Sequence, residues 1–313
     1  MPPLDVITFG ETMACFAAHE AGPLEEARSF TKIVAGAESN VAVGLARLGS
    51  RAGWVSRLGD DSFGRFIRAA LQAEGVDCSA VALDPARRTG FMLKSRAAAG
   101  ADPVVEYHRR GSAASALSLA DFDAERFFAA RHLHATGITP ALSPSCAELA
   151  ERAMRAMRAA GRTVSFDPNL RPALWPDREA MAEHLNRLAG LADWVLPGLA
   201  EGRLLTGLAA PEDIAAFYLG RGARAVVIKL GAEGAYWRTA EAGGRVSGVR
   251  VEQVVDTVGA GDAFAAGLIS ARLEGMDWPR AIARANWVGA RAIQVVGDMD
   301  GLPHRASLPA ELR

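Results

Sequence analysis

From residue 144 onward, segments with the periodicity of helices alternate with short runs of apolar residues. The helical segments are 144–159, 179–191 and 212–220, and the apolar runs are 163–166, 194–196 and 225–230. An alternation of units of this size predicts a parallel sheet covered by helices on both faces. A buried strand is predicted at 4–9, and two further helices at about 260–273 and 278–294.

Two stretches break this alternation. Residues 13–34 and 90–109 carry short alternating segments without a helical segment between them. Antiparallel strands inserted into a parallel frame have no place in the main sheet, so we expect a small separate sheet that forms a lid. There is no linker-like or repeated segment. We therefore expect a single domain over residues 1–313, with lid segments inserted at about 12–35 and 88–112.

Charge and composition exclude several classes of protein. The 313 residues include 35 Lys and Arg against 36 Asp and Glu, which argues against binding to nucleic acid or to a membrane surface. Charged residues interrupt every apolar run, so nothing is expected to span a membrane. Cys15, Cys78 and Cys146 lack metal-ligand spacing, and no secretory signal precedes them. These features predict a cytoplasmic protein without disulfides or structural zinc.

The strongest local motif is Asp-Thr-Val-Gly-Ala-Gly-Asp at residues 256–262. Gly259 and Gly261 let backbone N–H groups approach an anion, and a helix that begins near Ala260 adds the positive end of its dipole. Asp262, in the first helical turn, could take a proton from a hydroxyl while the glycine turn neutralises a phosphoryl group. Taken alone, the segment is equally compatible with an ordinary helix start, because short glycine motifs are common.

Two further segments favour the catalytic interpretation. Gly-Ala-Glu-Ser-Asn at 36–40 precedes an apolar helix, and Gly-Asp-Asp-Ser-Phe-Gly at 59–64 follows it. Together with 256–262, they resemble the two signatures of the ribokinase-like (PfkB) carbohydrate kinases across nearly the whole chain. The resemblance implies a ribokinase-like α/β fold: a mostly parallel central sheet, helices on both faces and a small β-sheet lid. It also implies ATP with Mg²⁺ as cofactors, and it leaves a monovalent-cation requirement open.

Segments 107–115, 166–175 and 297–303 look like those of the 2-keto-3-deoxygluconate kinases. This narrower resemblance implies phosphorylation of the primary hydroxyl of a sugar acid, 2-keto-3-deoxygluconate, to give its 6-phosphate. Guanidinium groups suit a planar carboxylate better than ammonium groups do, which makes Arg109 and Arg171 the candidates for binding it. Either residue could instead be a solvated surface arginine.

The resemblance assigns roles to individual positions. The catalytic base falls on Asp262, and the anion hole falls on Gly259, Ala260 and Gly261. The sugar contacts fall on Gly36, Asn40, Tyr107, Arg109 and Arg171. The nucleotide contacts fall on Asn169, Lys229, Gly231, Gly234 and Asn286, and Glu201 is expected to organise Mg²⁺ through water. Asn286 could alternatively face solvent or cap a neighbouring loop.

The chain departs from the family pattern at two positions. Gly198 stands where the family often has an asparagine, three residues before Glu201, so the local metal network or γ-phosphate contact is expected to differ. Met92 stands where related kinases often have a tyrosine, so one sugar hydroxyl contact is expected to be missing. Selectivity among sugars is therefore open.

Other interpretations stay open at this stage. Fructose, ribose and 5-keto-2-deoxygluconate kinases share both signatures, and a non-catalytic sugar or nucleotide sensor could use the same fold, although such a protein has no need of a base at Asp262. His132 and His134 face the same side of a predicted strand and could bind a metal, but without a third ligand we favour hydrogen-bonded core histidines. An exposed edge of the lid sheet favours a homodimer or a higher homo-oligomer.

Overall fold

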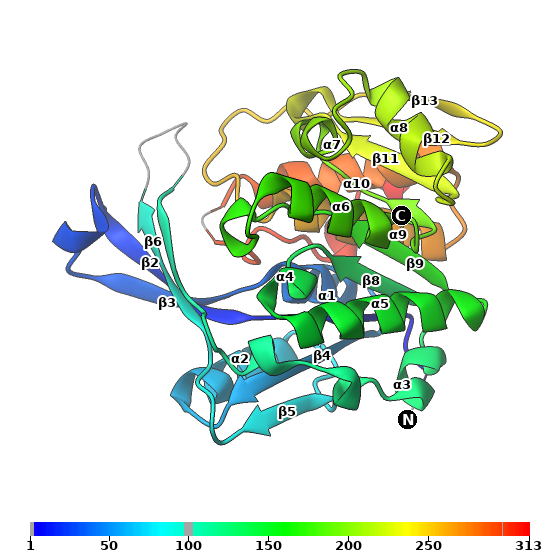
Figure 1. Ribbon diagram of the computed structural model, residues 1–313. Coiled ribbons are helices and arrows are strands. Elements are labelled where there is room, and N and C mark those ends of the chain that lie inside the picture. Colours follow the sequence, from blue (N-terminus) through cyan, green and yellow to red (C-terminus); the bar gives the residue numbers. More distant parts are fainter. Residues whose placement is uncertain (1–2, 97–102, 296) are drawn as a thin grey trace.

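The computed structural model of this protein describes residues 3–96, 103–295 and 297–313, so residues 97–102 of the predicted lid segment lie outside the described residues. Within those ranges, nine strands form one sheet in the order β13-β12-β11-β10-β9-β8-β1-β4-β5 (Figure 1). Their bounds are β1 Val6–Phe9, β4 Ala52–Gly59, β5 Val81–Asp84, β8 His132–Thr136, β9 Thr163–Asp167, β10 Trp194–Val195, β11 Ala225–Lys229, β12 Ala235–Thr239 and β13 Gly243–Val246.

The sheet is parallel from β5 to β11, and β12 and β13 extend it as an antiparallel edge. The chain starts in the middle at β1, builds outward to β4 and β5, and then returns to β8 on the other side of β1. The strand order therefore reverses between β1 and β8. In open parallel sheets, ligands bind beyond the carboxyl ends of the strands at such a reversal.

Helices cover both faces of this sheet, as predicted. Successive strand residues point to opposite faces: in β11, Val227 joins one apolar core and Val226 and Ile228 join the other. The first core is covered by α1 Ala37–Arg47, α2 Ser62–Ala73, α9 Ala260–Leu273 and α10 Trp278–Ala292. The second is covered by α3 Ala124–Ala129, α4 Thr139–Leu142, α5 Pro144–Ala159, α6 Arg178–Ala189, α7 Leu199–Thr206 and α8 Pro211–Leu219.

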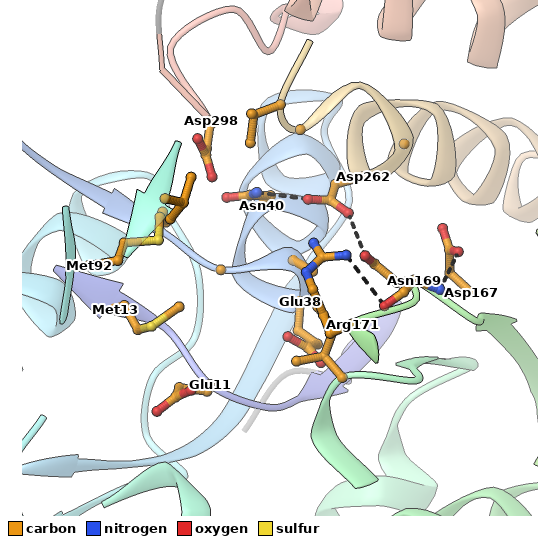
Figure 2. Close-up of a pocket in the computed structure, with 18 of the residues that line it drawn as sticks. Glu11, Met13, Glu38, Asn40, Met92, Asp167, Asn169, Arg171, Asp262 and Asp298 are labelled. Atoms are coloured by element: carbon orange, nitrogen blue, oxygen red, sulfur yellow. Dashed lines mark hydrogen bonds between the residues drawn. The ribbon is translucent and has the colours of Figure 1, made fainter. Parts of the chain in front are cut away.

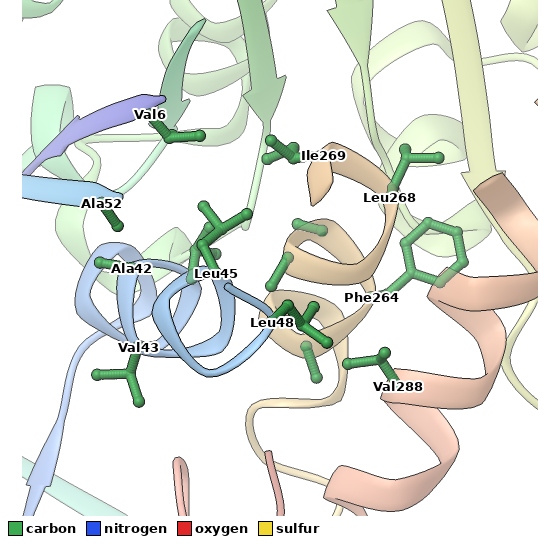
Figure 3. Close-up of a cluster of buried hydrophobic side chains, with 14 of the residues drawn as sticks. Val6, Ala42, Val43, Leu45, Leu48, Ala52, Phe264, Leu268, Ile269 and Val288 are labelled. Carbon is green, nitrogen blue, oxygen red and sulfur yellow. The ribbon is translucent and has the colours of Figure 1, made fainter. Parts of the chain in front are cut away.

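Helices α1 and α9 pack directly against each other beneath the sheet (Figure 3). Leu45 on α1 and Ile269 on α9 are fully buried in this contact. A methyl group at Gly44 would lie 2.7 Å from the Cβ of Ala266, so only glycine permits this separation. The packing fixes the N-terminus of α9 relative to the N-terminus of α1.

A separate four-stranded sheet, in the order β3-β2-β6-β7, projects from the main body (Figure 1). Its strands are β2 Met13–Ala21, β3 Phe30–Ala35, β6 Phe91–Arg96 and β7 Val105–His108, so the small separate sheet is confirmed. The expectation that its strands are antiparallel is wrong for β2 and β6, which pair in parallel. Both strands enter the small sheet from the carboxyl ends of parallel strands, β1 and β5, and therefore run in the same direction.

None of the helices within the described ranges has both the length and the apolar character needed to cross a bilayer.

Candidate active site

A cavity of about 360 Å³ lies at the carboxyl ends of the central strands, beside the reversal between β1 and β8. Its walls come from the loops after β1 and β9, from the end of β11, from the N-termini of α1 and α9, and from the small sheet. Figure 2 shows many of these residues around the cavity. The sequence-predicted residues that it brings together are Gly36, Asn40, Tyr107, Arg109, Asn169, Arg171, Glu201, Lys229, Gly259, Gly261 and Asp262. Segments more than 200 residues apart thus share one site.

Asp262 lies in the first turn of α9 between two asparagine side chains (Figure 2). Asn40 donates a hydrogen bond to Oδ2 at 2.8 Å, and Asn169 donates one to Oδ1 at 3.4 Å. Burial raises the pKa of the carboxyl from 3.8 to about 7, with a contribution from the negative charge of Asp167, against the lowering effects of Asn40 and Arg171. A carboxylate with such a pKa can accept a proton near neutral pH.

The turn that begins α9 requires glycine. Gly259 has φ +80°, and a Cβ there would lie 2.7 Å from the carbonyl oxygen of Asp298. The turn therefore exposes backbone N–H groups at a helix N-terminus without a side chain in the way, which is a favourable site for an anion. Gly259 and Gly261 line the cavity, whereas Ala260 is outside its lining.

The two predicted carboxylate-binding arginines have different environments. Arg171 lines the cavity, and its guanidinium donates a hydrogen bond to the Leu170 carbonyl at 2.9 Å. Arg109 is buried and forms an ion pair with Glu11 at 2.6 Å, and the Ser112 hydroxyl contacts the other oxygen of the same carboxylate. Arg109 is therefore not a solvated surface arginine, and its charge is already paired with a buried carboxylate.

Lys229 and Asp167 both line the cavity and form an ion pair at 2.6 Å. Gly231 and Gly234 have φ +62° and +93° in the tight turn after β11, outside the cavity lining. Asn286 on α10 donates hydrogen bonds to the carbonyls of Val246 and Ser247, at 3.3 and 3.0 Å. Its amide thus holds the loop after β13, which agrees with the loop-capping alternative.

Glu201 joins two loops of the site. Its Oε2 accepts the N–H of Gly198 at 2.7 Å, and its Oε1 accepts the N–H of Leu170 at 2.8 Å. The described residues contain no cluster of three or more His, Cys, Asp or Glu side chains suited to hold a metal directly. Mg²⁺ commonly keeps several waters and binds through one or two carboxylates plus phosphates, so the carboxylates that line the cavity fit such an ion.

His132 and His134 are buried core residues. The ring of His132 hydrogen-bonds Thr163 at 2.7 Å and Ser165 at 2.8 Å, and His134 hydrogen-bonds Ser165 at 2.8 Å. Burial lowers the pKa of both imidazoles, to about 3 for His134. The prediction of hydrogen-bonded core histidines is confirmed.

Several charged residues at the cavity were not among the predicted site residues, namely Glu11, Glu38, Lys94, Asp167 and Asp298. Glu38 is fully buried, accepts hydrogen bonds from Thr136 at 2.6 Å and Thr139 at 2.7 Å, and has a pKa raised by burial. Glu11 directly follows Gly10 at the end of β1. Because ligands bind at the carboxyl ends of strands in open parallel sheets, this position could have been predicted as part of the site. The partners of Lys94 are Asp256 and Asp298, which lie in segments that the sequence analysis quoted, but no local pattern indicated that they pair with Lys94.

Comparisons with known proteins agree with this geometry. Residues 4–305 match the model of a protein family described as "pfkB family carbohydrate kinase". The chain is 53% identical over 310 residues to the 2-dehydro-3-deoxygluconokinase of Bacillus subtilis (strain 168), covering 99% of this chain and 95% of that one. A crystal structure of a PfkB protein from Polaromonas sp. JS666 superposes with a TM-score of 0.91 at 54% identity, covering 98% of this chain and 99% of that one.

A further similar structure was solved with ligands. It is a putative ribokinase II from E. coli in complex with ATP and Mg²⁺, with a TM-score of 0.89, 29% identity and 97% of each chain covered.

Proposed function

The chain belongs to the pfkB family of carbohydrate kinases, and we propose that it transfers the γ-phosphoryl group of ATP to the primary hydroxyl of 2-keto-3-deoxygluconate. The product is the 6-phosphate. The similar protein from Bacillus subtilis is named for this activity, since 2-dehydro-3-deoxygluconate is the same compound. The observation that carries the proposal is the placement of Asp262, the glycine turn and Arg171 in one cavity.

In this mechanism, the hydroxyl oxygen of the sugar attacks the γ-phosphorus while Asp262 takes the proton of that hydroxyl. The bond between that phosphorus and the β–γ bridging oxygen breaks, and ADP leaves with the electron pair. Asn40 and Asn169 hold the carboxylate in place for this step. Backbone N–H groups at Gly259–Gly261 face the negative charge of the transferring group. Bound Mg²⁺ would neutralise phosphate charge, and the carboxylates at the cavity, among them Glu201, would hold it through water.

Recognition of the sugar acid falls to the arginines. Arg171 offers a guanidinium at the cavity whose described hydrogen bonds are to the backbone carbonyls of its own loop. Arg109 is paired with Glu11, and the pair together carries little net charge. Arg109 therefore offers the sugar acid a fixed hydrogen-bond donor and adds little charge attraction. We therefore expect Arg171 to supply most of the attraction for the substrate carboxylate. Gly36 and Tyr107 line the same cavity and are proposed as further sugar contacts.

On the nucleotide side, we propose that Lys229, Gly231 and Gly234 lie along the phosphates and that Asn286 shapes the adenine site indirectly, through the loop that it holds.

We also propose that the four-stranded sheet is a lid over the sugar, within a single domain, and that its edge strand pairs in a homodimer. Light scattering tests the dimer. In the cytoplasm, which we propose as the site of action, the buried free cysteines would stay reduced.

A substrate panel with a coupled ADP assay tests the proposed function. It contains 2-keto-3-deoxygluconate, 5-keto-2-deoxygluconate, fructose and ribose, each with ATP and Mg²⁺. We expect the highest kcat/KM for 2-keto-3-deoxygluconate. Preference for fructose or ribose would replace the substrate assignment while leaving the kinase assignment, and sugar binding without turnover of any acceptor would identify a sensor. A potassium titration in the same assay decides whether a monovalent cation is needed.

A further inference from the structure

Three charged side chains are buried together beside the cavity, and the mechanism above does not use them. Lys94 of β6 places its Nζ 2.7 Å from Asp256 Oδ2 and 3.3 Å from Asp298 Oδ1. Their exposed fractions are 4%, 9% and 5%. Burial of charge at this depth is costly unless partners are in place, and here two carboxylates hold the pKa of Lys94 above its usual value.

The two aspartates shape the glycine turn at the start of α9. Asp256 Oδ1 accepts the N–H of Val258 at 3.1 Å, and Oδ2 accepts the N–H of Gly297 at 3.3 Å. The backbone carbonyl of Asp298 lies directly against Gly259, at the point where any other residue would carry its Cβ. Because Asp256 and Asp298 lie in the loop segments 251–258 and 297–300, which the structure describes without helix or strand, these contacts fix how the turn presents its N–H groups.

Asp298 is also connected to the base. Asn40, which donates to Asp262 at 2.8 Å, also lies beside Asp298, where its amide lowers the pKa of that carboxyl against the raising effect of burial. Figure 2 shows Asn40 between the two carboxylates. A continuous series of contacts thus runs from Lys94 in the small sheet through Asp298 and Asn40 to Asp262.

We propose that Lys94 is a positioning residue for phosphoryl transfer. Its ammonium holds the loops of Asp256 and Asp298 together, and through them it fixes the anion-binding turn and the asparagine that orients the base. Without the ammonium, two buried carboxylates repel each other at the point where the turn is formed. The inference rests on the proposed function, because it takes Asp262 as the base and the turn as the anion hole.

The test compares Lys94→Met with a matched control, Lys32→Met. Lys32 lies on β3 of the same sheet, where its Nζ sits 4.1 Å from the centre of the Phe66 ring and outside the charged cluster. Because a misplacement of about 1 Å can cost about 100-fold in rate, we expect Lys94→Met to lower kcat by about 10- to 100-fold. The KM values for sugar and ATP should change much less, and Lys32→Met should leave both parameters unchanged.

A double variant separates positioning from general stability. In Lys94→Met/Asp298→Asn, the asparagine amide can donate to Asp256, so the loops can meet again without the ammonium. We expect the kcat of the double variant to be higher than that of Lys94→Met and lower than that of wild type, because an amide restores the contact but not the charge-assisted hydrogen bonds of the ammonium. Circular dichroism and thermal unfolding establish the folded fraction of each variant, and kcat is expressed per folded enzyme.

Three results would overturn the proposal: a folded Lys94→Met enzyme with kcat within about twofold of wild type, a loss confined to KM, or a double variant no better than the single one. If Lys94→Met does not fold, the double variant decides alone, and wild-type kcat in it overturns the proposal. All rates are measured with whichever acceptor the wild-type enzyme phosphorylates. A different sugar substrate therefore leaves the test intact, whereas absence of any turnover in wild type refutes the proposed function instead.

Discussion

Asp262 is partly buried at the cavity and receives hydrogen bonds from two amides, and this combination suits a base that must be both reactive and oriented. Burial raises its pKa to about 7, while Asn40 and Asn169 fix its two oxygens. Asp262→Asn keeps the shape of the side chain but cannot take a proton. We expect it to bind ATP and sugar nearly as wild type does and to lower kcat by about 10²- to 10⁴-fold. Calorimetric binding together with steady-state kinetics checks this, and more than a tenth of wild-type turnover would remove Asp262 from the role.

The raised pKa of Asp262 gives the direction of two pH effects. The base acts in its deprotonated form. Since kcat/KM reflects pKa values of the free enzyme, kcat/KM should rise as the pH is raised through about 7. The folded-state pKa is above the ordinary value of 3.8, so ionising Asp262 destabilises the folded state as pH rises from 3.8 to about 7. Asp262→Asn should therefore have a higher Tm than wild type at pH above about 7, and this advantage should vanish toward acid pH. A pH-independent Tm difference would contradict this account.

Arg109 and Arg171 should differ in what they contribute to stability. Arg109→Ala leaves Glu11 buried without its cation, and breaking a buried pair of this kind typically costs about 3–5 kcal/mol. Arg171 has no such carboxylate partner among its described contacts, so Arg171→Ala should change the free energy of unfolding little. Urea denaturation of both variants measures the difference, and equal losses would contradict the assigned environments.

At the scale of residues, sequence motifs indicated Asp262, the glycine turn and both arginines as site residues, and the structure places them at one cavity. The motifs did not predict Glu11 as the partner of Arg109, because the two residues are 98 positions apart and meet only when β1 and β7 are assembled. The same holds for Lys94 and Asp256, which are separated by 162 positions. Pairings of this range depend on topology, which a local pattern does not contain.

Among the elements, the small sheet has a small apolar cluster of its own, separate from the two main cores. Only Met13, Cys15, Ala35 and Met92 are buried in that cluster. If this sheet closes over the sugar, hydrogen exchange in β2, β3, β6 and β7 should slow when sugar is added, because closure excludes water from the site. Protection confined to the nucleotide side, around β11 and α10, would contradict the lid assignment.

Long elements were predicted more accurately than short ones. The bounds of α5 and α9 agree with the predicted ranges, since each has the periodicity of a long helix and a clear start. Helix α7 was not predicted, because its eight residues between Gly198 and Gly207 are too few to show a helical period. The antiparallel edge strands β12 and β13 were also missed, and their pairing is set by the chain reversal after β11.

For the whole molecule, the order of strands decides where the chemistry takes place. The chain leaves β1 in one direction and returns on the other side at β8, and this places Glu11, Asp167 and the start of α9 around one opening. The two apolar cores on opposite faces of the sheet hold this arrangement rigidly. A nearly neutral net charge of −1 gives the molecule no overall attraction for an anionic substrate. Selection of a sugar acid must therefore come from local groups at the cavity.

We propose that a local guanidinium, that of Arg171, selects a carboxylate-bearing sugar for phosphorylation. The most direct test is kcat/KM of wild type and Arg171→Ala for 2-keto-3-deoxygluconate and for fructose, which has no carboxylate. Loss of charge-assisted hydrogen bonds worth about 1.5–3 kcal/mol should lower kcat/KM for the sugar acid by about 10- to 150-fold and for fructose much less. Arg171→Lys should recover only part of the loss, because an ammonium lacks the planar fork. Equal losses for both sugars would contradict the claim and identify Arg171 as scaffold or nucleotide contact.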